Sequence, residues 1–395
     1  MKILVLNSGS SSIKFQVIEK PENIVLATGL VEKIGLVEGA IHYKTGSYNT
    51  SLEIKIPDHK FGLRKVVNLL LDEKVGVLGD VSEIAMVGHR VVHGGKDFTA
   101  TTYITDKVKN KIRDLFDLAP LHNPPNLNGI EVAEEIFPNA KQVAVFDTSF
   151  HQTLPEKSYT YAIPMKFRDE NNIRLYGFHG ISHKYVSEEA NKLLNADKSK
   201  IITIHLGNGC SMTAVENGKS IEHSLGFSPN EGLVMGTRSG AIDSGIIFHL
   251  IEVLGYTPQE VNLLLSKKSG MLGLTGYSDL REIEQKASEG DRACQLALEI
   301  NAYRIKKLIG AYAVVMNGLD AIIFTAGIGE NSEVIRNMVC ENMDFLGIKI
   351  DIEKNSLRSK EIREISERDS KVKIFVIPTN EELEIANEAY NLFLR

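Results

Sequence analysis

The sequence has 395 residues, of which 43% are hydrophobic and 24% charged, with 32 glycines, no tryptophan and a formal net charge of −6. This length predicts two domains, and the composition excludes a disordered or fibrous protein. Interspersed charges of both signs argue against a nucleic-acid-binding surface. Because the three cysteines form no C-x-x-C pair and neither a signal-peptide core nor a membrane span is recognisable, we expect a cytoplasmic protein.

The first predicted elements form a hairpin. Residues 3–6 are an apolar strand, residues 7–12 (NSGSSS) a small polar turn, and residues 13–17 an alternating strand. Small residues let backbone N–H groups approach an anion closely, and Lys14 adds a positive charge. Taken alone, the segment fits a phosphate-binding hairpin and a plain Ser/Gly-rich turn equally well. It is not a Walker A motif, because G-x-x-x-x-G-K-[ST] is absent and a strand follows.

Strands and helices then alternate. The predicted strands are 84–87, 91–92 and 143–146, and the predicted helices are 126–137, behind a Pro-Pro pair, and 181–194. Such alternation predicts an α/β architecture with mainly covered sheets. We place the domain boundary just after Asp147, in the loop 148–155.

A second hairpin follows in the middle of the chain. Residues 201–206 and 212–215 are predicted strands around the turn 207–211 (GNGCS). This pattern repeats that of residues 3–17 and divides the chain into two similar halves. Two such hairpins favour a phosphate held from both sides, although a lone Gly-Asn-Gly is usually just a turn.

The last predicted elements are a long helix at 291–316, a buried strand at 321–325 and a closing helix at 382–394. The segment 327–331 (GIGEN) follows the strand and opens a helix. Open α/β sheets bind ligands at such strand ends, and helix N-termini favour anions. The alternative for this segment is a tight strand-to-helix turn.

Two arginines lie in glycine-rich segments, Arg90 in GHRVVHGG and Arg238 in MGTRSG. A guanidinium between glycines is suited to bidentate contacts with carboxylate or phosphoryl oxygens. The alternative is an arginine that caps a loop by donating to backbone carbonyls.

Asp147 and Glu381 each follow a buried strand, where a magnesium–phosphate site would place carboxylates. For Glu381, an acid favoured by a helix N-terminus is a strong alternative. His179 and His183 have metal-ligand spacing, but Gly180 lies between them and no third ligand follows, which excludes zinc. We therefore expect His179 to be a charge-stabilising donor.

Together these segments resemble the acetate kinase family of the acetate and sugar kinase/Hsc70/actin superfamily, along essentially the whole chain. The segments that carry the resemblance are 7–15, 88–95, 145–151, 176–180, 205–209, 231–240 and 327–331. Together and in this order they are highly specific, although none would be alone. The resemblance implies an α/β fold of two duplicated actin-like (ribonuclease H-like) domains, each a mixed sheet flanked by helices. It implies an N-terminal domain at 1–148, a C-terminal nucleotide-binding domain at 149–381, a closing helix at 382–395 that returns to the first domain, and a homodimer.

The resemblance also implies the activity and its residues. ATP would phosphorylate acetate to acetyl phosphate, reversibly, with Mg²⁺ (or Mn²⁺) held by Asn7 and Glu381. Asp147, His179 and Arg238 would be catalytic, and Arg90 would bind the acetate carboxylate. The methyl group would lie against Val92, Leu121, Phe178 and Pro229. The implied ATP contacts are Lys14, His205, Leu206, Gly207, Asn208, Gly209, Asp279, Leu280, Arg281, Gly327, Ile328, Gly329, Glu330 and Asn331.

One region departs from the family pattern, which has Leu at Asn230, an acid at Ala241 and Pro at Ser244. The missing acid leaves open what orients Arg238, and Asp243 is one alternative. The alternatives for the function are a propionate or butyrate kinase and a non-catalytic nucleotide switch of the actin or Hsp70 kind. A sugar kinase fits less well, because a neutral hydroxyl has no use for a carboxylate-binding arginine.

Overall fold

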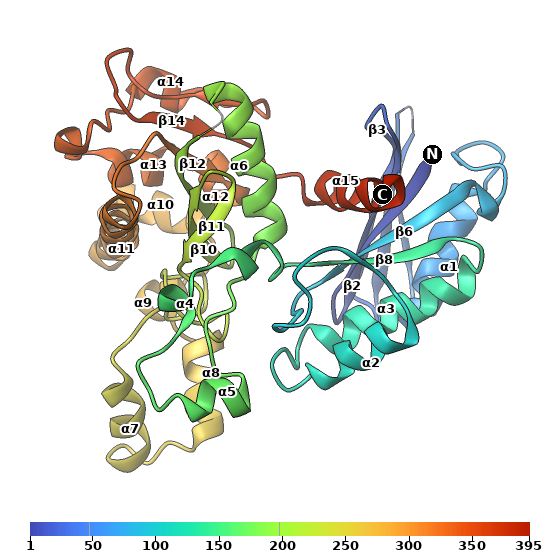
Figure 1. The fold of residues 1–395 in the computed structure, drawn as a ribbon, viewed down its shortest axis with the longest axis horizontal. Coiled ribbons are helices and arrows are strands. Elements are labelled where there is room, and N and C mark those ends of the chain that lie inside the picture. Colours follow the sequence, from blue (N-terminus) through green and yellow to red (C-terminus); the bar gives the residue numbers. More distant parts are fainter. Residues whose placement is uncertain (47, 197) are drawn as a thin grey trace. The chain divides into compact units, whose positions relative to one another are not determined.

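The structure is a computed structural model that describes residues 1–46, 48–196 and 198–395. It divides into two compact units, unit 1 (Met1–Phe150 and Asn380–Arg395) and unit 2 (His151–Thr379) (Figure 1). The boundaries drawn from the sequence, after residues 148 and 381, lie within two residues of these. No helix among the described residues is long and apolar enough to cross a membrane.

Unit 1 is built on an eight-stranded mixed sheet in the order β5-β4-β3-β2-β1-β6-β8-β7. Its strands are β1 (Lys2–Ser8), β2 (Ser12–Glu19), β3 (Ile24–Glu32), β4 (Gly39–Thr45), β5 (Asn49–Ile54), β6 (Ile84–Val91), β7 (Thr102–Tyr103) and β8 (Lys141–Phe146). Strands β1, β6 and β8 are parallel neighbours, so their carboxyl ends meet at one edge of the sheet.

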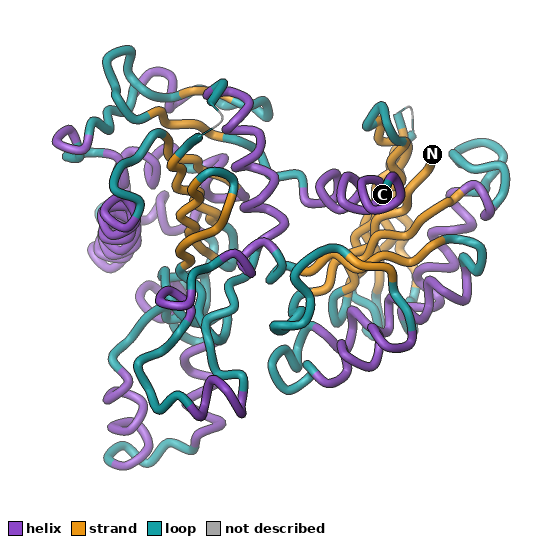
Figure 2. The backbone as a smooth tube through the Cα atoms, viewed as in Figure 1, coloured by secondary structure: helices purple, strands orange, loops and turns teal. Residues whose placement is uncertain are grey.

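Helices cover both faces of this sheet (Figure 2). They are α1 (His59–Leu70), α2 (Asp106–Asp114), α3 (Asn123–Ile136), α15 (Glu381–Leu394) and the short 3₁₀ helix η1 (Val81–Glu83). One face packs a core of β1 to β4 against α1 and α3, with Leu4, Val87 and Val132 fully or nearly buried. On the other face α15 passes so close to β6 that a Cβ at Gly88 would lie 2.7 Å from Ile385.

Unit 2 is built on a six-stranded mixed sheet in the order β11-β10-β9-β12-β14-β13. Its strands are β9 (Lys200–Leu206), β10 (Cys210–Glu216), β11 (Lys219–His223), β12 (Ala321–Thr325), β13 (Arg363–Glu364) and β14 (Lys373–Val376). Its helices are α4 (Glu156–Tyr159), α5 (Lys166–Asn171), α6 (Gly180–Leu194), α7 (Ser244–Glu252), α8 (Pro258–Lys267), α9 (Gly270–Thr275), α10 (Leu280–Ser288), α11 (Arg292–Val315), α12 (Ala326–Asn331), α13 (Glu333–Cys340) and α14 (Ile352–Ser356). Two 3₁₀ helices are η2 (Phe150–Thr153) and η3 (Asp344–Leu346).

The two sheets repeat one topology, which confirms the expected duplicated α/β fold. Three antiparallel strands are followed by two parallel ones and a two-residue antiparallel edge strand: β3-β2-β1-β6-β8-β7 in unit 1 and β11-β10-β9-β12-β14-β13 in unit 2. Each sheet contains the hairpin that was expected from a small polar turn, β1–β2 in unit 1 and β9–β10 in unit 2.

Two expectations about element boundaries are wrong. The predicted strands 84–87 and 91–92 are joined in one strand, β6, and the predicted helix 126–137 begins earlier. Helix α3 begins at Asn123, so Pro124 and Pro125 form its first turn instead of preceding it. Proline fits there because the first N–H groups of a helix have no partner within the helix.

Candidate active site

In unit 1, the expected binding residues gather where β1, β6 and β8 end and α15 begins. Asn7 lies directly opposite Lys14 in the first hairpin. Arg90 is the penultimate residue of β6, Asp147 follows β8, and Glu381 is the first residue of α15. This unit therefore brings together the expected metal ligands, the carboxylate-binding arginine and one of the expected catalytic residues.

Asp147 holds Arg90 by a bidentate ion pair. Arg90 Nε donates to Asp147 Oδ1 at 3.2 Å and Nη2 to Oδ2 at 2.5 Å, while Nη1 lies 3.4 Å from Asn7 Oδ1. Asp147 is 1% exposed and the Arg90 side chain 21%. Burial lowers the pKa of Arg90, but the charges of Asp147, Glu381 and Glu382 more than offset this and raise it above its ordinary value. The ion pair occupies Nε and Nη2, whereas Nη1 donates a longer hydrogen bond to Asn7.

Acidic groups outnumber basic ones around this pair. Burial raises the pKa of Glu381; the charges of Asp147 and Glu382 raise it further, and those of Arg90 and Lys14 only partly offset this. Lys14 Nζ lies 2.6 Å from Glu382 Oε1, with half of the lysine side chain exposed. Three carboxyl groups thus face two cations, so one carboxyl group lacks a counter-charge that a bound cation would supply.

Three residues that the sequence did not single out fix the loops of this site. Asn126 Nδ2 donates to the Ser8 carbonyl at 2.7 Å, and its Oδ1 accepts from the Val92 N–H at 3.0 Å. Asn123 binds both backbone groups of His93, and His59 Nε2 lies 2.7 Å from the Gly9 carbonyl. The signal for the two asparagines is the N-P-P-N segment itself, whose helix start places both side chains beside the strand ends.

In unit 2, His179 and Arg238 converge on the second hairpin turn. A Cβ built at Gly209 would lie 3.4 Å from His179 Nε2 and 3.6 Å from Arg238 Nη1. His179 precedes α6 in the left-handed conformation, φ 55° and ψ 25°, which costs a non-glycine residue about 1–2 kcal/mol. The structure therefore brings together two of the expected catalytic residues.

The orienting partner of Arg238 is a backbone carbonyl. Arg238 Nη1 donates to the Pro229 carbonyl at 3.0 Å. Asp243 has a different role, since its Oδ1 accepts from the Gly245 N–H at 2.7 Å and caps α7. The alternative that Asp243 orients Arg238 is therefore wrong.

A cavity of about 960 Å³ lies at the turn that follows β9 and at the first turns of α10 and α12. Eight of the expected ATP contacts line it: Gly207, Asn208, Asp279, Leu280, Arg281, Gly327, Ile328 and Asn331. Four residues that were not predicted complete the lining: Ser278, Glu284, Ser332 and Arg358. The first three lie one to three residues from expected contacts, so the neighbouring segments could have indicated them, whereas tertiary packing alone brings Arg358 to the cavity.

The other expected ATP contacts lie outside this lining. Lys14 belongs to unit 1, and Leu206 is buried at the end of β9. His205 is stacked on His179 with ring centroids 4.4 Å apart. The carbonyls of Gly329 and Glu330 accept from Arg336 and Arg363, which fixes the backbone of α12.

The four residues expected around the methyl group are divided between the units. Val92 is buried and Leu121 is 64% exposed in unit 1, whereas Phe178 is buried and Pro229 half-buried in unit 2. Neither unit contains all four.

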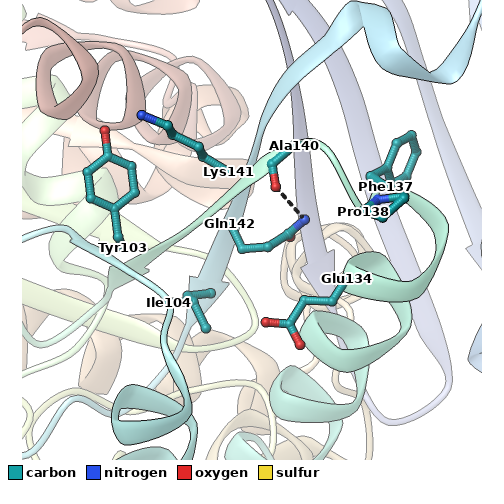
Figure 3. Close-up of a pocket in the computed structure, with 8 residues that line it drawn as sticks. All are labelled: Tyr103, Ile104, Glu134, Phe137, Pro138, Ala140, Lys141 and Gln142. Carbon is teal, nitrogen blue, oxygen red and sulfur yellow. Dashed lines mark hydrogen bonds between the residues drawn. The ribbon is translucent and has the colours of Figure 1, made fainter.

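A further cavity in unit 1, of about 420 Å³, does not resemble a ligand site. Figure 3 shows its lining, with the Gln142 amide turned back to the Ala140 carbonyl at 3.4 Å. Gln142 Oε1 lies 2.8 Å from His89 Nε2, and Glu134 is paired with Lys109 at 2.9 Å. Because its polar groups already have partners, we assign no ligand to it.

The chain is similar to known proteins along almost its whole length. The acetate kinase of Flavobacterium johnsoniae is 61% identical over 392 residues, which cover 99% of this chain and 99% of that protein. A crystal structure of Porphyromonas gingivalis acetate kinase matches with a TM-score of 0.94 at 44% identity, covering 99% of both chains. A propionate kinase from Francisella tularensis matches with a TM-score of 0.92 at 43% identity, covering 98% of both. The family model described as the acetokinase family matches residues 2–387, and the chain belongs to that family.

Proposed function

We propose that this protein transfers the γ-phosphoryl group of ATP to acetate, reversibly, giving ADP and acetyl phosphate. The observation that carries the proposal is the clustering, within unit 2, of eight expected nucleotide contacts around one cavity large enough for a nucleotide. The 61% identity to an acetate kinase over the full length supports the choice of acetate as the acceptor.

The site in unit 1 suits a divalent cation, and we propose Mg²⁺, with Mn²⁺ as a substitute. The donor set fits, because Asn7 offers an amide oxygen, Glu381 a carboxylate, and the surroundings carry excess negative charge. The cation would neutralise charge on the phosphoryl oxygens.

The protein's own residues position the reactants and stabilise charge. Acetate is ionised at neutral pH, since carboxyl groups titrate near 4, so no strong general base is needed. Arg90 binds the acetate carboxylate through the edge that Asp147 leaves available, and Asp147 acts by fixing that guanidinium. His179 and Arg238 stabilise the charge on the transferring phosphoryl group.

The proposal is tested by a coupled assay of phosphorylation across formate, acetate, propionate and butyrate. We expect the highest kcat/KM for acetate. A higher kcat/KM for propionate would mean that the acceptor is propionate, as in the name of the Francisella relative, and not acetate. ATP hydrolysis that no acid stimulates would overturn the kinase and favour a nucleotide switch.

Lys14→Ala tests the first hairpin. We expect a rise of about tenfold in the KM for MgATP, because one charged contact contributes about 1.5 kcal/mol, with little change in the acetate KM. Glu382 loses its ion pair in this variant as well, so Glu382→Gln is the matched control, and it should change the ATP KM less. Equal nucleotide kinetics in Lys14→Ala and the unaltered protein would contradict the phosphate contact.

We also propose that the protein is a cytoplasmic homodimer. Large apolar side chains of α7 and α11 are exposed, among them Phe248 at 59%, Tyr303 at 62% and Val314 at 79%. An exposed group of this kind is typical of a surface that another chain covers.

A further inference from the structure

Unit 2 contains a row of five histidines, four of them buried, and the proposed reaction uses only part of this row. The ring centroids of His151 and His223 are 4.0 Å apart, those of His223 and His183 5.4 Å, those of His183 and His205 6.0 Å, and those of His205 and His179 4.4 Å. Burial lowers the pKa of His151 to about 4, and burial together with neighbouring histidines lowers the pKa of His183 and His223 well below 6.5. These three rings are therefore neutral at pH 7, and each carries a single N–H.

Two of these histidines bind the backbone N–H and carbonyl of Phe178, the residue before His179. The Phe178 N–H donates to His223 Nε2 at 3.1 Å, so the proton of His223 lies on Nδ1, which donates to Thr213 Oγ1 at 2.8 Å. The Phe178 carbonyl accepts from His151 Nε2 at 3.0 Å. Backbone groups that can only donate or only accept thus set both tautomers. These two hydrogen bonds to the Phe178 backbone stabilise the left-handed backbone conformation of His179.

A second series of hydrogen bonds leads to His179 itself. Thr203 Oγ1 lies 2.7 Å from His183 Nδ1, His183 Nε2 lies 2.7 Å from Ser211 Oγ, and Ser211 Oγ lies 2.8 Å from His179 Nδ1. Ser211 is fully buried, and these two imidazoles are its side-chain partners among the residues described. Since Ser211 has one hydrogen, it donates to one ring and accepts from the other.

Thr203 decides the direction of this series. The second acceptor within its reach is the Thr213 carbonyl at 3.5 Å, well beyond the usual O–H···O distance of 2.5–3.0 Å. The Thr203 hydroxyl therefore donates to His183 Nδ1. Neutral His183 then donates from Nε2 to Ser211, and Ser211 donates to His179 Nδ1.

The consequence is a defined tautomer at the proposed catalytic histidine. With Nδ1 accepting, neutral His179 carries its proton on Nε2, the atom that faces the Gly209 turn beside Arg238. We propose that Thr203, His183 and Ser211 are positioning residues that hold His179 as a neutral Nε2–H donor toward the transferring phosphoryl oxygen. The assignment of the receiving group rests on the proposed function, whereas the tautomer rests on the hydrogen bonds alone.

The tautomer can be measured without any assay of activity. Long-range ¹H–¹⁵N spectra of histidine-labelled protein at pH 8 distinguish Nε2–H from Nδ1–H rings. We expect Nε2–H for His179, His183 and His151, and Nδ1–H for His223. Nδ1–H at either His179 or His183 would overturn the relay, whatever reaction the protein catalyses.

Kinetics test the positioning role. Ser211→Ala is expected to lower kcat about tenfold with less than a twofold change in either KM, because the donor acts in the transition state. The matched control is Ser187→Ala, a buried serine of α6 whose hydroxyl donates to the Lys184 carbonyl, and it should leave kcat unchanged. Equal effects of the two variants, or a Ser211→Ala loss confined to the KM values, would refute positioning.

A third variant, His179→Gln, separates this inference from the proposed function. If His179→Gln retains full activity while the spectra show the expected tautomers, the role of His179 in the reaction fails and the relay stands.

Discussion

Between pH 7.5 and pH 5 the free energy of unfolding is expected to fall steeply, because five buried histidines are neutral in the folded protein. Burial lowers the pKa of His89, His93 and His151 to about 4, and the pKa values of His183 and His223 lie well below 6.5. In the unfolded chain each histidine titrates near 6.5, so the unfolded state binds more protons below that pH.

The sign and the pH window follow from this difference. Full stability is present above pH 6.5 and is lost as the pH falls from 6.5 toward 4. The slope approaches about 1.4 kcal/mol per pH unit for each histidine, or about 7 kcal/mol per pH unit if all five contribute. Two of these histidines lie in unit 1 and three in unit 2, and domains are stable by about 5–15 kcal/mol, so we expect each unit to lose a large share of its stability before pH 5.

Urea denaturation at half-unit pH steps measures this slope. His93→Gln should lower this slope by the share of one histidine. A free energy of unfolding that does not change from pH 7.5 to 5 would contradict this, because it would mean that the histidines bind protons equally in the folded and the unfolded state.

The second large effect is expected for Arg90→Leu. The carboxyl group of Asp147 would remain at 1% exposure without its bidentate partner, which costs about 3–5 kcal/mol of folding free energy. The same change should lower kcat/KM for acetate by tenfold to a hundredfold, through a rise in the acetate KM much larger than that in the ATP KM.

The double variant Arg90→Leu/Asp147→Leu separates the two effects. Removing both charges should restore most of the stability, because an apolar pair of similar volume replaces a buried ion pair at little cost. It should not restore acetate phosphorylation. A double variant as unstable as Arg90→Leu would mean that Asp147 is not the main partner, and a larger effect on the ATP KM would reassign Arg90 to the phosphates.

The sequence predicted most where structure depends on neighbours along the chain. The β1–β2 and β9–β10 hairpins follow from small polar turns between apolar strands, and β12 was predicted to the residue. The strands β3, β4 and β5 have no comparable signal, since their pairing with the first hairpin is a long-range choice.

For the site, too, the sequence indicated individual residues from local patterns but not the contacts made between distant segments. Glycine-rich segments and isolated charges marked Arg90, Asp147 and Arg238, but did not indicate which groups these side chains bind. That Asp147 binds Arg90, and that a proline carbonyl orients Arg238, depends on loops that meet only in the folded units. His183 was considered only for its spacing from His179, and its link through Ser211 requires β10 to lie beside α6.

The discontinuity of unit 1 has a consequence for biosynthesis. Residues 1–150 leave the ribosome before unit 2, yet α15, the helix that packs on one face of their sheet, is translated only after all of unit 2. At 5–20 residues per second the delay is on the order of tens of seconds. During it the β6 surface at Gly88 lacks Ile385, and Lys20 lacks Asn387, which lies 2.6 Å away in the finished protein. Until α15 has followed unit 2, the nascent chain therefore lacks both the helix that covers this face of the sheet and Glu381.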